Sequence, residues 1–284
     1  MQQENTDKLM KPGRGGGPAL QKVDPKWFVQ LIIKPRATLK AILEKDRPVW
    51  LIPLLTLSIL AAVEALVFSH LDMTELAHHI RNLDFMQTLP PEEQEFQFLL
   101  IGPPVRPLYV YITPFIYAVG RLWIAWYLLS LVMNLILTSS GAKSSLVKNQ
   151  NLFAWAFLPL GLRYLIQTVS MLFSGTAIEA RGLSNLVFIR PEIPQRQFLY
   201  FFLNFLQSLL GSVDLFFLWV GLLLVVGILA GFQLPKKSKA IGLGVLAVVL
   251  TLVVMALSGA LIIPLSLDRQ SVFFRATYYF QMAW

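Results

Sequence analysis

The stretch FLYFFLNFLQSLLGSVDLFFLWVGLLLVVGILA, residues 198–230, decides the fold, because its 33 residues contain a single charged side chain, that of Asp214. An α-helix rises about 1.5 Å per residue, so about 20 apolar residues cross a hydrocarbon core about 30 Å thick. The stretch is long enough to span a membrane. Its excess length requires a tilt or a break, and Gly211 and Asp214 provide a position for a break.

Four further apolar runs of 21 to 31 residues have the same character, and they lie at residues 50–70, 108–138, 152–173 and 241–265. The long 108–138 run contains Pro114 and Gly120, where it can also break. Hydrophobic residues make up 56% of the 284-residue chain and charged residues only 14%, against about 25% in soluble proteins, which excludes an ordinary soluble enzyme. The sequence predicts an all-α fold, a polytopic membrane bundle of five transmembrane helices with an N-terminal amphipathic interfacial helix.

The basic residues are distributed unevenly between the two sides of this bundle. Fifteen Lys and Arg residues precede the first run or lie in the 139–151 and 231–240 loops, whereas seven lie in the alternate segments. By the positive-inside rule, the N-terminus is cytoplasmic and the C-terminus extracytoplasmic. The net charge of +8 therefore reflects topology, and we expect no nucleic-acid partner.

The N-terminal part divides into a polar tail at residues 1–23, expected to be disordered, and an amphipathic interfacial region at residues 24–48. In this region apolar side chains recur at helical spacing, and a proline interrupts them before a basic residue; the residues concerned are Trp27, Phe28, Leu31, Pro35 and Arg36. We expect the region to lie along the cytoplasmic leaflet, with Trp27, Phe28 and Leu31 in lipid or against another chain. A simple helical lead into the first span is equally compatible with the pattern.

The remaining segments are a five-span membrane domain at residues 49–265 and an aromatic extracytoplasmic tail at residues 266–284. Aromatic side chains are typical of membrane interfaces, so we expect the tail to anchor there, with a docking surface as the alternative. Small residues at Gly227, Gly231, Ala240 and Gly244 flank the turn between the last two runs. They predict close helix packing in a hairpin, and oligomerisation through this face is the alternative.

Motifs for catalysis are absent from the sequence: it contains no Cys, no His-Glu-x-x-His helix, no Gly-x-Ser-x-Gly elbow and no phosphate-binding loop. Ser140 and Lys143 have Ser-x-x-Lys spacing but lie in a short loop without companion motifs. The residues His70, His78 and His79 form a possible metal-binding group, but a solvated amphipathic helix explains them better, since neighbouring side chains diverge on a helix. We therefore predict a protein that is not an enzyme and holds no cofactor and no metal.

Four ionisable residues fall inside the predicted spans: Glu64, Arg121, Arg163 and Asp214. Charge at membrane depth is costly unless it is paired or hydrated, so we expect buried ion pairs. Counting from the cytoplasmic end of each run puts Arg121 and Asp214 at about 26 Å, Glu64 at about 21 Å and Arg163 at about 17 Å. The depths favour Arg121 with Asp214 and Glu64 with Arg163, with a pair of Glu64 and Arg121 also open.

Two short segments resemble the bacterial branch of the Yip1 family: IIKPRATLKAIL at residues 32–43 and RPVWLIPL at residues 47–54. The family pattern is a Pro-Arg-x-Thr helix followed by an aromatic and proline-rich entry to the first of five spans. The resemblance implies an integral protein of a bacterial plasma membrane, without catalytic residues, that works in assemblies. Some bacterial members are associated with ABC-type export systems.

Two functions from different classes are compatible with these observations. The first is an accessory or assembly subunit that lies in the lipid bilayer and binds another integral membrane protein, such as an ABC permease, with a homo-oligomer also possible. The second is a small transporter or ion-conducting protein that uses Glu64, Arg121, Arg163 and Asp214. An intramembrane enzyme is the weakest reading, because it depends only on the histidine group.

Overall fold

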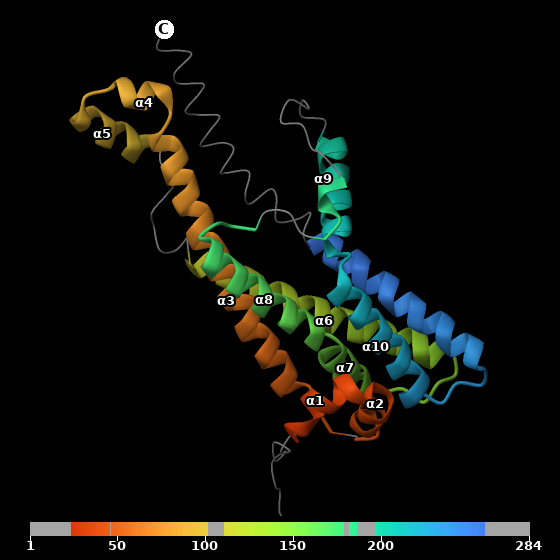
Figure 1. The fold of residues 1–284 in the computed structure, drawn as a ribbon. Helices are drawn as coiled ribbons and strands as arrows, with labels where there is room; N and C mark the ends of the chain where they lie inside the picture. Colours follow the sequence, from red (N-terminus) through yellow and green to blue (C-terminus); the bar gives the residue numbers. More distant parts are fainter. Residues whose placement is uncertain (1–23, 46, 102–110, 179–181, 187–196, 259–284) are drawn as a thin grey trace, which may run out of the picture.

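The computed structural model describes residues 24–45, 47–101, 111–178, 182–186 and 197–258. These residues form helices and connecting turns without a strand, which confirms the predicted all-α class (Figure 1). The helices are α1 (Lys26–Ile33), α2 (Pro35–Leu43), α3 (Leu51–Arg81), α4 (Asp84–Thr88), α5 (Pro91–Ile101), α6 (Thr113–Ser139), α7 (Leu146–Ala156), α8 (Leu158–Ser174), η2 (Ser184–Leu186, a 3-10 turn), α9 (Gln197–Ser212), α10 (Leu215–Gly231) and the helix Lys237–Ser258.

Four helices in the described part of the chain are long and apolar enough to cross a membrane: Leu51–Arg81, Thr113–Ser139, Leu146–Ser174 and Lys237–Ser258. The stretch around Asp214 forms a pair of helices, Phe202–Ser212 and Leu215–Gly231, that meet at an angle of 76°. Counted as one broken span, this pair brings the total to five. The break occurs at the predicted position, whereas the 108–138 run differs, because α6 begins at Thr113 and continues through Gly120.

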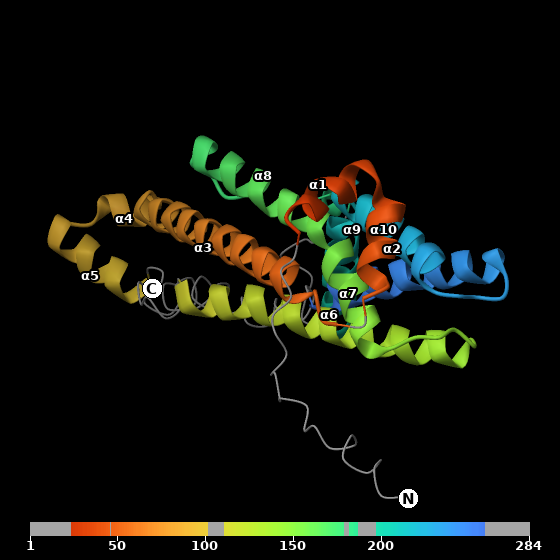
Figure 2. The ribbon, with the colours of Figure 1, turned by 90° about the horizontal axis from the view of Figure 1, so that it is seen from below.

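The short helix α7 is the centre of the bundle. It contacts α2, α3, α6 and α10. Seven consecutive residues from Asn151 to Phe157 are buried, and such burial on all sides is the mark of a helix enclosed by others. Figures 1 and 2 both show α1, α2 and α7 together at one end of the bundle, while α4 and α5 lie at the far end of α3.

Local sequence signals explain the boundaries of these helices. Ser145 caps α7 by accepting a hydrogen bond from the Lys148 backbone N–H at 3.2 Å. Proline is tolerated in the first turn of a helix, and Pro35 and Pro159 lie in the first turns of α2 and α8. Gly175 ends α8 with a φ of 68°, a left-handed conformation that favours glycine.

The N-terminal helices pack differently from the expectation. Trp27 and Leu31 are buried in the chain's own core, where the Trp27 ring meets the Trp155 ring edge-on with centroids 5.6 Å apart. Phe28 also packs on Trp155, whereas Arg36 is exposed at the start of α2. The side chains on the opposite face of α1 remain open, with Val29, Ile32 and Ile33 exposed to 59, 60 and 68%. Trp27 and Phe28 thus contact α7, and Leu31 lies in the chain's own core, where contact with lipid or another chain was expected.

Gly227 and Gly231 of α10 also contact helices other than the following helix, which was their predicted partner. A Cβ atom added to Gly227 would meet the Leu152 side chain, and one added to Gly231 would meet Leu43, so these glycines admit α7 and α2. Contact between α10 and the following helix involves Gly244, where an added Cβ would lie 2.9 Å from the Val225 Cα. The predicted hairpin contact therefore holds for Gly244. Ala240 is buried at the start of the last helix.

Candidate functional site

The break between α9 and α10, residues 213–214, brings an acid and a base together within the described spans. The Arg163 guanidinium on α8 lies 3.1 Å from a carboxylate oxygen of Asp214. The two side chains are only 8 and 19% exposed, so the ion pair is largely shielded from solvent. At such sites an unpaired charge is costly, and the pair therefore ties α8 to the break.

Each charge of this pair also binds the end of a helix. The Asp214 carboxylate accepts a hydrogen bond of 2.8 Å from the Phe217 backbone N–H in the first turn of α10. The Arg163 guanidinium donates a long hydrogen bond of 3.5 Å to the Gly211 carbonyl in the last turn of α9. A helix is partially positive at its N-terminus and partially negative at its C-terminus. The acid therefore faces the positive end and the base the negative end.

A short loop closes over the end of α9. The Leu183 backbone N–H donates to the Leu210 carbonyl at 3.0 Å. Gly182, next to it, has a φ of 54°, and a Cβ added there would lie 2.7 to 2.9 Å from three backbone carbonyl oxygens of residues 210, 211 and 213. Glycine is therefore required at this position by both backbone conformation and close approach.

The structure corrects the expected pairing of Asp214, which is with Arg163 instead of Arg121. The predicted depth of Arg163 was counted from Leu152, but the third span begins at Leu146. Counted from Leu146, Arg163 lies about 26 Å along its span, the same distance at which Asp214 lies from Gly231. The polar residues between Leu146 and Leu152 also belong to the helix. The membrane helix therefore begins six residues before the apolar run 152–173 from which the depth was counted.

The other two intramembrane charges lie on neighbouring helices. Glu64 is buried on α3, the helix that packs against α8, and its pairing with Arg163 stays a prediction. Arg121 is half-buried on α6, and no described carboxylate lies within 4.0 Å of its guanidinium. Arg121 instead lines a cavity between α6, α8 and the last helix.

The histidines of the α3 extension make local contacts. His78 lies 2.8 Å from the Asn82 side-chain amide, and His70 lies 3.3 Å from the Tyr111 hydroxyl. Among the described residues, no three His, Cys, Asp or Glu side chains are grouped closely enough to hold a metal ion.

The match to a family model decides the membership of the chain. The model of the Yip1 domain matches residues 29–258, most of the chain. The chain belongs to the Yip1-domain family. No curated protein and no solved structure matches it in the corresponding comparisons. The match covers every described membrane helix, so the broken pair α9 and α10 lies inside the Yip1 domain.

The sequence did not indicate that two polar side chains of this Yip1 domain, Asn149 and Asn151, are buried. Asn151 is fully buried on α7, accepts from the Val49 N–H at 2.9 Å and donates to the Arg47 carbonyl at 3.1 Å. Asn149 donates to the Ser144 hydroxyl at 2.7 Å. Both were assigned to a cytoplasmic loop, although the N-cap at Ser145 was a signal that a helix begins there.

Proposed function

We propose that this Yip1-domain protein is a non-enzymatic accessory subunit that binds another integral membrane protein through α9. The observation that supports it is the departure of α9 from the bundle at 76°. Among α1 to α10 and η2, α9 contacts η2 substantially, and Figure 1 shows it standing away from α3, α6 and α8. Phe202 is exposed on α9, whereas residues 203–212 are half-buried or buried. A helix of 16 residues is about 24 Å long, so it offers a contact surface of its own.

The composition of α9 favours a membrane-embedded partner. The helix sequence QFLYFFLNFLQSLLGS contains no charged residue, and Phe202 on it is 45% exposed. Aromatic side chains are enriched at the centres of protein interfaces. Because the resemblance to bacterial family members implies export assemblies, the permease of an ABC-type system is the partner to test first.

Site-specific crosslinking in native membranes tests this proposal. We replace Phe202 on α9 with p-benzoylphenylalanine and, as a matched control, Leu218 on α10, which is exposed but belongs to the bundle. The proposal predicts a stoichiometric crosslink to one membrane protein from position 202 and none from position 218. Recovery of the protein alone from mild detergent, with no crosslink at either position, would contradict it.

The helix break favours a second candidate, a small transporter or ion-conducting protein. Interrupted helices carry the substrate and ion sites of many transporters, and here an acid and a base meet at the interruption. Flux into proteoliposomes that is abolished by Asp214→Asn or Glu64→Gln would support this candidate. Absence of flux for a panel of monovalent ions and protons would remove it.

The proposed placement in the membrane has an independent test. Basic loops at residues 139–151 and 231–240 put that side, together with α1 and α2, in the cytoplasm. The chain has no native Cys, so single cysteines introduced at Lys143 and at Thr176 can be labelled separately. Labelling of Thr176→Cys, but not of Lys143→Cys, by a membrane-impermeant reagent on intact cells is the expected result.

A further inference from the structure

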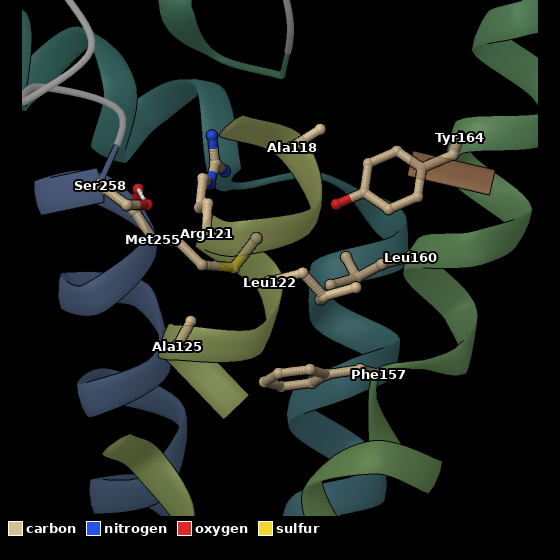
Figure 3. A pocket seen from close by; sticks show the side chains of 9 residues that line it. All are labelled: Ala118, Arg121, Leu122, Ala125, Phe157, Leu160, Tyr164, Met255 and Ser258. Carbon is tan, nitrogen blue, oxygen red and sulfur yellow. Dashed lines mark hydrogen bonds between the residues drawn. The ribbon is translucent and has the colours of Figure 1, made fainter. Parts of the chain in front are cut away.

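A cavity lies between α6, α8 and the last helix (Figure 3). Besides the Ser258 hydroxyl, which donates to the Met255 carbonyl at 2.8 Å, two polar side chains line it, Arg121 from α6 and Tyr164 from α8. Figure 3 shows the Tyr164 hydroxyl directed into the cavity. Its other walls are mainly apolar and include Leu122, Phe157, Leu160 and Met255. The cavity therefore combines the Arg121 cation and the Tyr164 hydroxyl with hydrocarbon surroundings.

Neither polar group is satisfied by the described protein. No ion pair or hydrogen bond joins the Arg121 guanidinium to a side chain or carbonyl of the described residues, and the same holds for the Tyr164 hydroxyl. The situation contrasts with Arg163, one residue before Tyr164, which is paired with Asp214. A guanidinium at membrane depth needs an anion or water, and it binds oxyanions such as phosphate with two parallel hydrogen bonds.

The shape of the cavity and the position of Arg121 restrict the ligand. The cavity has a volume of about 30 Å³, and the empty space between its walls is about 370 Å³ when space open to the surroundings is included. Such a site admits one anionic group whose remainder stays outside. Arg121 lies about 27 Å along α6 from Ser139, close to the far edge of a hydrocarbon core about 30 Å thick. Phospholipid headgroups occupy this level of a bilayer.

We propose that the Arg121 and Tyr164 side chains bind the phosphate of an anionic phospholipid, whose acyl chains lie along the apolar mouth of the cavity. The guanidinium supplies the charge, and the Tyr164 hydroxyl donates a further hydrogen bond to a phosphate oxygen. This inference does not depend on a protein partner, so it can hold or fail independently of the accessory role.

Native mass spectrometry of the full-length protein from nanodiscs of phosphatidylcholine with phosphatidylglycerol tests the site. The wild-type protein should retain one phosphatidylglycerol molecule in preference to phosphatidylcholine, and Arg121→Gln should weaken this retention at least tenfold. Arg121→Lys should be intermediate, because an ammonium keeps the charge but loses the paired hydrogen bonds. Lys237→Gln, which removes one exposed positive charge outside the cavity, is the matched control and should bind as wild type.

Tyr164→Phe is a second variant that tests the site if the Arg121 variants fail to fold. It removes only the hydroxyl group and keeps every charge, so we expect it to fold. It should weaken retention by about fivefold, the effect of one hydrogen bond of about 1 kcal/mol. Equal retention by wild type, Arg121→Gln and Tyr164→Phe would overturn the proposal. Displacement of the lipid by excess inorganic phosphate, with thermal stabilisation of the wild type and not of Arg121→Gln, would identify a free anion as the ligand and overturn the lipid assignment.

Discussion

The N-terminal end of the bundle and the break between α9 and α10 solve the same problem by different means. Both bring polar groups into an apolar interior. At the N-terminal end the polar groups are neutral: the Asn151 amide binds the backbone at Val49 and Arg47, and the Trp155 indole N–H donates to the Val49 carbonyl at 3.2 Å. At the break they are ionised, with Arg163 and Asp214 each matched to a helix end.

The difference between the two regions concerns what each holds in place. The amide of Asn151 fixes residues 47–49, a segment without secondary structure that leads into α3. The ion pair instead fixes two helices at an angle and compensates the helix ends exposed there. Neutral hydrogen bonds thus stabilise the core at the N-terminal end of the bundle, and an ion pair stabilises the point where a helix is interrupted.

The largest effect is expected from Asn151→Leu. The variant keeps the volume but leaves the Val49 N–H and the Arg47 carbonyl without a partner, and each unsatisfied backbone group costs about 1–3 kcal/mol. The free energy of unfolding should fall by about 4 kcal/mol. Thermal denaturation in detergent measures this loss, and Gln150→Leu, at a neighbouring half-buried position, is the control with a change below about 1 kcal/mol. Equal losses would show that Asn151 contributes no more than its neighbour.

The second effect tests the ion pair at the break. Asp214→Asn removes the charge but keeps a good N-cap for α10, so the expected loss of about 3 kcal/mol reports on the ion pair with Arg163. Adding Arg163→Gln should recover much of the loss, because the two residues are coupled. The double variant of Asp214→Asn with Arg121→Gln should be additive, since no ion pair joins these residues. Coupling to Arg121 instead of Arg163 in this double-mutant cycle would contradict the observed geometry.

The spans and their interruptions were predictable because they follow from local composition. Apolar length gave the membrane helices, Pro35 gave the boundary between α1 and α2, and Gly211 with Asp214 marked the break. These features depend on residues close in sequence. The family resemblance was likewise carried by short segments, and the Yip1-domain match confirms it.

The pairing of charges and the partners of helix faces were not predictable, because they depend on three-dimensional packing. The third span extends six residues below its apolar run, through Asn149 and Asn151, and this shift moved Arg163 to the level of Asp214. For α1, the sequence pointed to Trp27 and Leu31 as buried side chains, but it could not tell that they pack in the chain's own core instead of against lipid or another chain. Gly227 and Gly231 were assigned to a hairpin contact, whereas they admit the side chains of Leu152 and Leu43.

A smaller effect on stability is expected at the loop that closes over α9. Comparing two glycines separates the cost of backbone strain from the cost of a steric clash. Gly182 and Gly175 both have a positive φ, but a Cβ at Gly175 would meet nothing within 4 Å, whereas one at Gly182 would meet three carbonyl oxygens. Gly175→Ala should cost about 1 kcal/mol from strain alone, and Gly182→Ala about 2–3 kcal/mol. Hydrogen exchange should show faster exchange in η2 and the last turn of α9 for Gly182→Ala only. Identical stability losses for both variants would mean that the loop moves freely away from the break.

The smallest effect on stability is expected from the exposed face of α1, which includes Val29, Ile32 and Ile33. The same face offers a direct test of where α1 lies relative to the membrane. Ile33 is exposed to the surroundings, whereas Leu31 lies in the core, two residues away on the same helix. Ile33→Ser should change the free energy of unfolding by less than about 0.5 kcal/mol, whereas Leu31→Ser should lower it by about 3 kcal/mol. If this face rests on the cytoplasmic leaflet, a spin label at Val29 should report contact with lipid. Ile33→Ser should reduce that contact, because burial of an isoleucine side chain in lipid contributes about 2 kcal/mol to membrane binding. A label at Val29 that senses bulk water in both proteins would show that α1 is fixed by its contacts with α2 and α7 alone and does not rest on lipid.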